Sequence, residues 1–115
     1  MSLRSDVADW LGDFAAEVSE EQGEQLERAF DEIEARWPDQ DQADDRTEAA
    51  SAATQIILGD DTLEAIAGQW HEARRVERAR MAALTGALLA SSGSERELSE
   101  RTRVARMTVR KALGR

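Results

Sequence analysis

The sequence predicts an all-α protein with an N-terminal helical hairpin or bundle, a long connecting helix and a C-terminal tri-helical unit. Apolar side chains recur at intervals of three and four residues along most of the chain, which is the spacing of one helical face. Alternating apolar and polar runs, which would indicate strands, are almost absent. Pro38, Gly59 and the run Ser91–Gly93 interrupt the helical pattern and divide it into segments.

Two amphipathic helices are expected first, from Ser5 to about Ser19 and from about Glu21 to Trp37, where Pro38 ends the second. Each carries a stripe of large apolar side chains, and the two stripes can pack as an antiparallel hairpin. Stripes of this kind form a core or an interface between copies of a chain far more often than a cofactor site. The candidate dimer-interface residues are Trp10, Phe14, Phe30, Ile33 and Trp37.

The acidic segment Pro38–Arg46 is expected to be a polar loop. Its aspartates do not predict a calcium site, because the central glycine and the glutamate at the twelfth position of a calcium-binding loop are missing. We therefore expect neither a metal nor a cofactor.

A short alanine-rich helix is expected from Thr47, as its N-cap, to Leu58, with Gly59 just past its end. A new helix begins at Asp60 or Asp61 and continues to about Ala90, a length of about 45 Å. Its middle is strongly charged and is expected to face solvent. Its last turns, Met81–Leu89, would form the first helix of the C-terminal unit.

The net charge of −9 conceals a division of the chain into an acidic and a basic part. Residues 1–70 hold four arginines and nineteen acidic residues, whereas residues 71–115 hold eleven basic and five acidic residues. A basic C-terminal region on an acidic body is typical of a DNA-binding tail. The expected domains are therefore an acidic dimerisation or partner-binding region, 1–70, and a basic region, 71–115.

The stretch from Ser94 to Leu113 has the pattern of two short helices joined by a turn. Ser94 lies three residues before Glu97, as in a capping box. Leu98 would face inward, together with Ser99, which is small enough for close helix approach. In the second helix, from about Ala105 to Leu113, Val109 and Ala112 or Leu113 would be buried over Val104. The cations of that helix would then point outward, an arrangement that suits a polyanion groove.

Residues 94–113 resemble the helix-turn-helix core of GntR-type winged-helix regulators, with SEREL at 94–98 and RMTVRKAL at 106–113. The resemblance covers about twenty of the 115 residues. It implies that Arg96, Arg106 and Arg110 contact DNA bases and phosphates and that Thr108 contacts phosphate. That family continues into a β-hairpin wing after this core, whereas this chain stops at Arg115. We therefore expect a bare tri-helical unit here.

Two positions depart from the pattern of that family. Arg103 occupies the place of the usual turn glycine, so it must adopt a left-handed conformation at a cost of about 1 kcal/mol, or the turn must differ. Ala105 occupies the place of the usual serine N-cap of the second helix, which also costs roughly 1 kcal/mol.

The leading hypothesis is a sequence-specific binder of double-stranded DNA, a small transcriptional regulator or a plasmid or mobile-element accessory factor that acts as a homodimer. The alternative is a protein-interaction module that keeps the helix-turn-helix scaffold without binding DNA. A third hypothesis, an acidic mimic of DNA, is weaker because the basic tail argues against it. The acidic region could also bind a protein partner. The predicted DNA-binding residues are Arg96, Arg101, Arg103, Arg106, Met107, Thr108, Arg110 and Lys111.

The residues that enzymes need are scarce. The chain has a single histidine, His71, and no cysteine, and it contains neither a glycine-rich phosphate loop nor a nucleophile elbow. We expect no enzymatic activity. The N-terminal residues show no signal-peptide pattern and no apolar run is long enough to span a bilayer, so the expected location is the cytoplasm, without a membrane partner.

Overall fold

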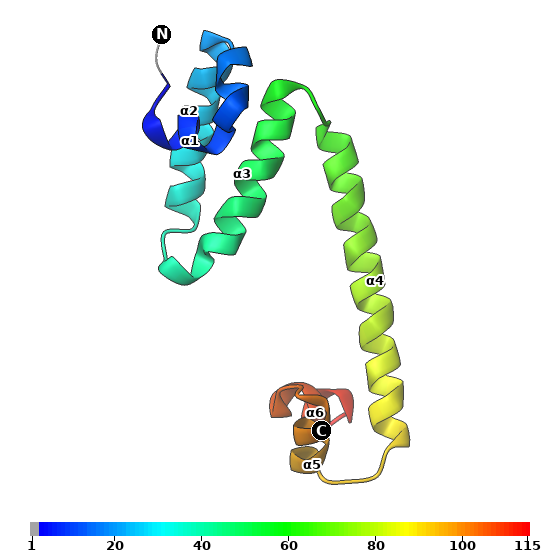
Figure 1. Ribbon diagram of the computed structural model, residues 1–115. Coiled ribbons are helices and arrows are strands. Elements are labelled where there is room, and N and C mark those ends of the chain that lie inside the picture. Colours follow the sequence, from blue (N-terminus) through cyan, green and yellow to red (C-terminus); the bar gives the residue numbers. More distant parts are fainter. Residues whose placement is uncertain (1–2) are drawn as a thin grey trace. The chain divides into compact units, whose positions relative to one another are not determined.

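A computed structural model describes residues 3–115, and every regular element in this part of the chain is a helix (Figure 1). The prediction of an all-α fold is confirmed. The chain divides into two compact units, the first ending at Ala67 and the second running from Gly68 to Arg115. None of the described helices combines the length and the apolar character that a membrane span requires.

The first unit begins with α1, Ser5–Leu11, and a 3₁₀ helix, η1, Gly12–Glu17. The prediction of one helix from Ser5 to about Ser19 is wrong, because Gly12 has a positive φ of 56° and ends the α-helix there. Val7 and Leu11 of α1 are buried against Leu26.

The second helix, α2, spans Glu20–Arg36, within one residue of its predicted bounds. Ser19 and Gln22 form a capping box at its start: the Gln22 amide donates to Ser19 Oγ at 3.1 Å and the Ser19 amide donates to Gln22 Oε1 at 3.0 Å. The main packing partner of α2 is α3, Ala43–Leu58, and its contact with α1 is smaller. The structure therefore pairs α2 mainly with the third α-helix, where the sequence had suggested the first.

The loop expected over Pro38–Arg46 is shorter than predicted, because a 3₁₀ turn, η2, occupies Gln40–Gln42 and α3 already begins at Ala43. Thr47 therefore lies inside the helix and is not its N-cap. The guanidinium of Arg46 holds this corner by donating to the carbonyl oxygens of Trp37 and Asp39, each at 2.6 Å.

Gly59 caps the end of α3 in the left-handed conformation, φ 80°, as the sequence predicts. The long helix, α4, spans Leu63–Ala90 without interruption. Thr62 starts it: its Oγ1 accepts a hydrogen bond from the Ala65 amide at 3.1 Å.

The second unit combines the C-terminal part of α4 with α5, Glu95–Thr102, and α6, Arg106–Ala112 (Figure 1). Its core consists of one buried side chain from each helix, Leu88, Leu98 and Val109. The predicted arrangement, in which the end of the long helix covers the helix-turn-helix, is therefore present. The partly buried residues around this core are Leu84, Val104, Ala112 and Leu113.

Candidate nucleic-acid interface

The start of α5 is fixed by Ser94, the predicted N-cap. Its Oγ accepts a hydrogen bond from the Glu97 amide at 3.1 Å. The Glu97 carboxylate accepts from the Ser94 hydroxyl, also at 3.1 Å. The predicted hydrogen bond from the Glu97 amide to the serine side chain is thus present. The Glu97 carboxylate, however, accepts from the Ser94 hydroxyl and not from the Ser94 amide, as it would in a full capping box.

The turn between α5 and α6 passes through Arg103, which adopts the left-handed conformation, one of the two alternatives expected there, with φ 59° and ψ 24°. Its amide donates to the carbonyl oxygen of Ser99 at 2.8 Å. Ser99 Oγ donates in turn to the carbonyl oxygen of Val104 at 2.6 Å. Thr102 Oγ1 donates to the carbonyl oxygen of Leu98 at 2.7 Å and accepts from the Val104 amide at 3.2 Å. These bonds satisfy the backbone of the turn and hold a strained residue in place.

Sequence reasoning missed the role of Thr102 and gave Ser99 only a packing role. The available signal was the presence of two hydroxyl residues beside the turn, since serine and threonine readily bond to nearby backbone groups.

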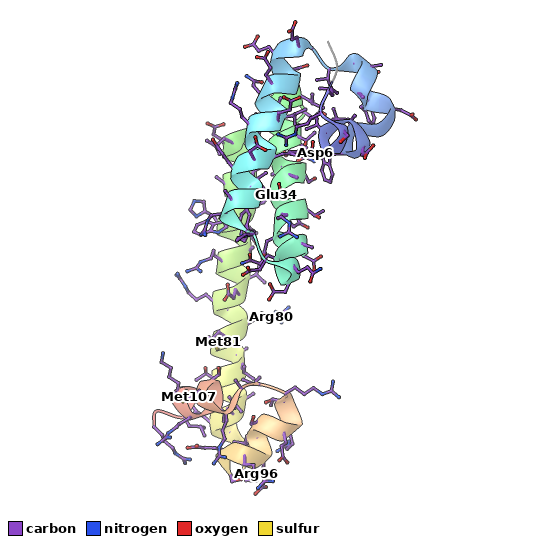
Figure 2. The ribbon with its side chains drawn as sticks, turned by 90° about the vertical axis from the view of Figure 1, so that its left-hand side faces the viewer. Asp6, Glu34, Arg80, Met81, Arg96 and Met107 are labelled. Atoms are coloured by element: carbon purple, nitrogen blue, oxygen red, sulfur yellow. The ribbon has the colours of Figure 1, made fainter. Side chains whose placement is uncertain are left out.

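The orientation of α6 about its axis follows from Val109, which is fully buried. At 100° per residue, Met107 and Lys111 fall opposite Val109, and Arg110 and Arg106 lie about 100° and about 60° from it, so the four exposed side chains share one arc of the helix. Met107 is the most exposed large apolar side chain among the described residues, at 76% (Figure 2). Thr108 lies at the edge of this arc and is half-buried.

Ala105 precedes α6 without a side-chain cap, as its identity requires. The first amides of α6 therefore lack the side-chain partner that a serine would supply.

Most predicted cations of this surface form no ion pair with the residues that the structure describes. Within residues 3–115, no salt bridge involves Arg101, Arg103, Arg106, Arg110 or Lys111, and all five side chains are exposed. We call the exposed residues of α6 and the turn the cationic face; they are Arg101, Arg103, Arg106, Met107, Arg110 and Lys111.

Arg96, which lies on α5 (Figure 2), is the exception among the predicted arginines, because its Nε lies 3.2 Å from Glu100 Oε1. A residue outside the predicted set joins the surface instead: Arg115 lines a shallow groove with Met107, Thr108, Arg110 and Lys111. Its guanidinium lies 3.5 Å from Glu95 Oε1. Its basic character was visible in the sequence, but its place beside α6 depends on the turn at Gly114, where φ is 77°.

The predicted dimer-interface residues are only partly brought together. The rings of Trp10 and Phe30 meet edge to face, with centroids 6.0 Å apart, and Trp10 Nε1 donates to Thr54 Oγ1 at 2.8 Å. Phe30 also packs on the core of its own unit. Phe14 lies in η1 and is 64% exposed.

Ile33 and Trp37 are half-buried, and Ile33 lines a shallow pocket with Trp10 and Phe30. Part of the predicted stripe is thus used for packing within the chain. Its role between two copies stays a prediction.

The perturbed ionisable groups lie elsewhere, in exposed ion pairs. The hydrogen bond from Arg4 lowers the pKa of Asp6, and the hydrogen bond from Arg75 lowers the pKa of Glu72. His71 sits edge to face against Trp70, with ring centroids 5.0 Å apart. Among the described residues, no group of histidine and carboxylate side chains is arranged to hold a metal ion.

Comparison of the chain with protein-family models, with curated proteins and with solved structures finds no match.

Proposed function

We propose that this chain is a sequence-specific binder of double-stranded DNA that acts as a dimer, as a small transcriptional regulator or a plasmid or mobile-element accessory factor. One observation carries the proposal: the cationic face is exposed, its cations form no salt bridge within the described part of the chain, and a core residue, Val109, fixes its direction. A rigid helix with free guanidinium groups on one face suits the major groove, which admits an α-helix.

Within the cationic face, we assign base contacts to Arg106 and Arg110. They lie on adjacent turns of α6, and arginine commonly donates two hydrogen bonds to O6 and N7 of guanine. Met107 lies next to Arg110 on the exposed arc, where its side chain can contact a thymine methyl group.

The remaining cations are assigned to phosphates. Arg101 and Arg103 belong to the end of α5 and the turn, and Lys111 lies at the edge of the exposed arc of α6. Such contacts set the register of a protein on the duplex without reading its sequence. Thr108, half-buried next to Lys111 at the same edge, would donate its hydroxyl to a phosphate. Arg96 is assigned a smaller share, because Glu100 competes for its guanidinium and adds a negative charge.

The acidic region of the chain has a different role in this proposal. Residues 1–70 carry a net charge of −15 and would be repelled by phosphate, so they serve partner binding or solubility and not DNA contact.

The test is selection of sequences from a random duplex library by the full-length protein, followed by titration of the enriched site at two salt concentrations. An enriched palindrome with steep salt dependence is the expected result, because a dimer reads two half-sites and releases counterions from several phosphates. Arg106→Ala and Arg110→Ala should each weaken binding of that site by about 1–3 kcal/mol. Arg75→Ala, which removes an arginine paired with Glu72 on α4, is the matched control and should leave affinity unchanged.

The alternative function is a protein-interaction module, and the uncapped start of α6 at Ala105 and the left-handed Arg103 favour it. Both features weaken a recognition helix that must hold its place in a groove. Absence of binding to any duplex, with residues 94–115 still helical by circular dichroism, would select this alternative over DNA binding.

A further inference from the structure

One face of α4 extends the core of the second unit into solvent. Leu84 and Leu88 on this face are covered by α5 and α6. Going back along the helix, the same face carries Met81, Glu77 and Trp70, which follow one another at intervals of four and seven residues. Trp70 is 59% exposed and Met81 is 48% exposed. We call Trp70, Arg74, Glu77 and Met81 the α4 stripe.

The α4 stripe includes charges that are not paired within residues 3–115. Glu77 takes part in no salt bridge in this part of the chain, and Arg74 lies over the ring of Trp70, 5.5 Å from its centroid. By contrast, the salt bridge of 2.6 Å between Arg75 and Glu72 lies on the opposite side of the helix. Arg74, Glu77 and Met81 also line a shallow groove along α4, and Met81 is labelled on this helix in Figure 2.

These features are self-complementary in one orientation. If two α4 helices run antiparallel about a midpoint between Arg75 and Val76, Trp70 of one copy lies opposite Met81 of the other, and Arg74 lies opposite Glu77. The aromatic–thioether and opposite-charge pairs then each occur twice. A parallel pair would instead place Glu77 beside Glu77 and repel.

We propose that the α4 stripe is the dimerisation surface of this protein and that its occupant is a second copy, packed antiparallel. Aligned helices are excluded, because α5 and α6 cover Leu84 and Leu88 on this face, where residues 63–67 of the second copy would lie. At the −50° crossing common in globular proteins, the two Leu88 residues would lie about 34 Å apart. This agrees with the separation of about 34–36 Å between half-sites one turn apart on DNA. Only this agreement rests on the proposed function; the pairing itself does not require DNA.

Sedimentation equilibrium of the full-length protein without DNA tests the surface. The wild-type chain should be a dimer. Met81→Glu should raise the dimer dissociation constant about 100-fold or more, since it places a carboxylate in both apolar contacts. Val76→Glu is the matched control, because Val76 is 40% exposed and lies on the other side of α4, and it should leave the dissociation constant unchanged. Circular dichroism confirms that both variants fold.

Charge reversal tests the ion pair. Arg74→Glu and Glu77→Arg should each weaken association about three- to tenfold, and the double variant should recover most of the loss, because both pairs are restored with opposite polarity. Equal or greater weakening in the double variant would overturn the pairing of Arg74 with Glu77.

Cysteine cross-linking tests the orientation, and the chain has no native cysteine to interfere. In the antiparallel pair, a mixture of Trp70→Cys and Met81→Cys chains should form a disulfide under oxidising conditions. Either variant alone should not, since its two thiols would lie about 16 Å apart along the pair, beyond disulfide reach. Cross-linking of each variant with itself would show parallel pairing and overturn the proposal.

The remaining outcomes separate this inference from the proposed function. A wild-type monomer, or a dimer that survives Met81→Glu but is lost in Phe14→Glu, would overturn the α4 surface whether or not DNA binds. A dimer sensitive to Met81→Glu that enriches no DNA sequence would support the surface and remove the proposed function.

Discussion

The hydroxyl of Ser99 donates a hydrogen bond of 2.6 Å to the carbonyl oxygen of Val104. This bond connects α5 to the residue that precedes Ala105, and so spans the whole turn of the helix-turn-helix. Since Val104 also packs against the core of Leu88, Leu98 and Val109, the bond joins the turn to that core. The direction of the cationic face therefore depends on a hydroxyl that carries no charge.

Loss of this hydroxyl should loosen the second unit. Ser99→Ala leaves the half-buried Val104 carbonyl without its side-chain donor, and we expect a loss of about 1 kcal/mol in the free energy of opening. Amide hydrogen exchange across residues 95–112 measures it. Ser92→Ala, which removes an exposed hydroxyl before α5, is the control. Equal protection in the two variants would contradict the role given to Ser99.

Arg103→Gly should have opposite effects on stability and on DNA affinity. Glycine adopts φ near 59° without strain, so the second unit should become more stable by about 0.5–1 kcal/mol. The same change removes a cation and should weaken binding of the selected site. Arg103→Ala removes the charge but keeps the strain, so it should lose affinity without gaining stability. A gain in stability with alanine would show that the charge, and not the backbone, is unfavourable.

Ala105→Ser should stabilise α6 by about 1 kcal/mol, because a serine hydroxyl can accept from the amides that Ala105 leaves uncapped. Thermal unfolding followed by circular dichroism, together with exchange of the first amides of α6, measures the gain. Because the substitution changes no charge, any effect on DNA affinity should come through helix order alone. Unchanged amide hydrogen exchange at Met107 and Thr108 would refute the predicted capping by the serine.

The two classes of cation should differ in how their loss depends on salt and sequence. Lys111→Ala should weaken binding to all duplexes similarly and should reduce the salt slope by about 1, as expected for a phosphate contact. Arg106→Ala should mainly reduce the preference for the selected site over random duplex. Titrations of both duplexes at several salt concentrations distinguish the classes, and an unchanged sequence preference in Arg106→Ala would show that Arg106 reads no base.

Asp6 gives a pH dependence of known sign. Arg4 donates to its carboxylate at 2.8 Å through both Nε and Nη2, and this lowers the pKa of Asp6 in the folded chain. A carboxyl whose folded pKa is depressed stabilises the fold above its unfolded pKa, near 4, and loses that contribution as the pH falls through the folded value. Asp6→Asn should therefore be less stable than the wild type at pH 7, and the difference should shrink below pH 4. Urea unfolding at both pH values measures it.

The helix-turn-helix was predictable because its determinants are local. Ser94, Leu98 and Val109 have the side-chain types that a cap and two inward positions require, and their spacing places them on the correct faces. The strained conformation of Arg103 was one of two alternatives, because the resemblance placed this residue where a turn glycine is usual. The proposed roles in dimerisation and in DNA binding stay predictions.

The first unit was less predictable, because its helix ends depend on competing side-chain bonds. Thr47 is a good N-cap residue, but Arg46 binds two carbonyl oxygens of the preceding turn and lets the helix start at Ala43. Similarly, the apolar stripe continued past Gly12, and only the backbone conformation of that glycine separates α1 from η1. The periodicity of apolar residues predicts which side chains share a helical face, but it does not predict where a helix ends.

The burial of large side chains in two separate places has a thermodynamic consequence. One core holds Val7, Leu11 and Leu26, the other holds Leu88, Leu98 and Val109, and in the middle of α4 every residue from Gly68 to Ala83 is exposed. Cooperativity of unfolding comes from shared burial, so a single all-or-none transition, and hence a single Tm, is not a well-defined property of this chain. The middle of α4, with no core of its own, would then melt with a concentration-dependent midpoint, as a segment ordered by self-association does.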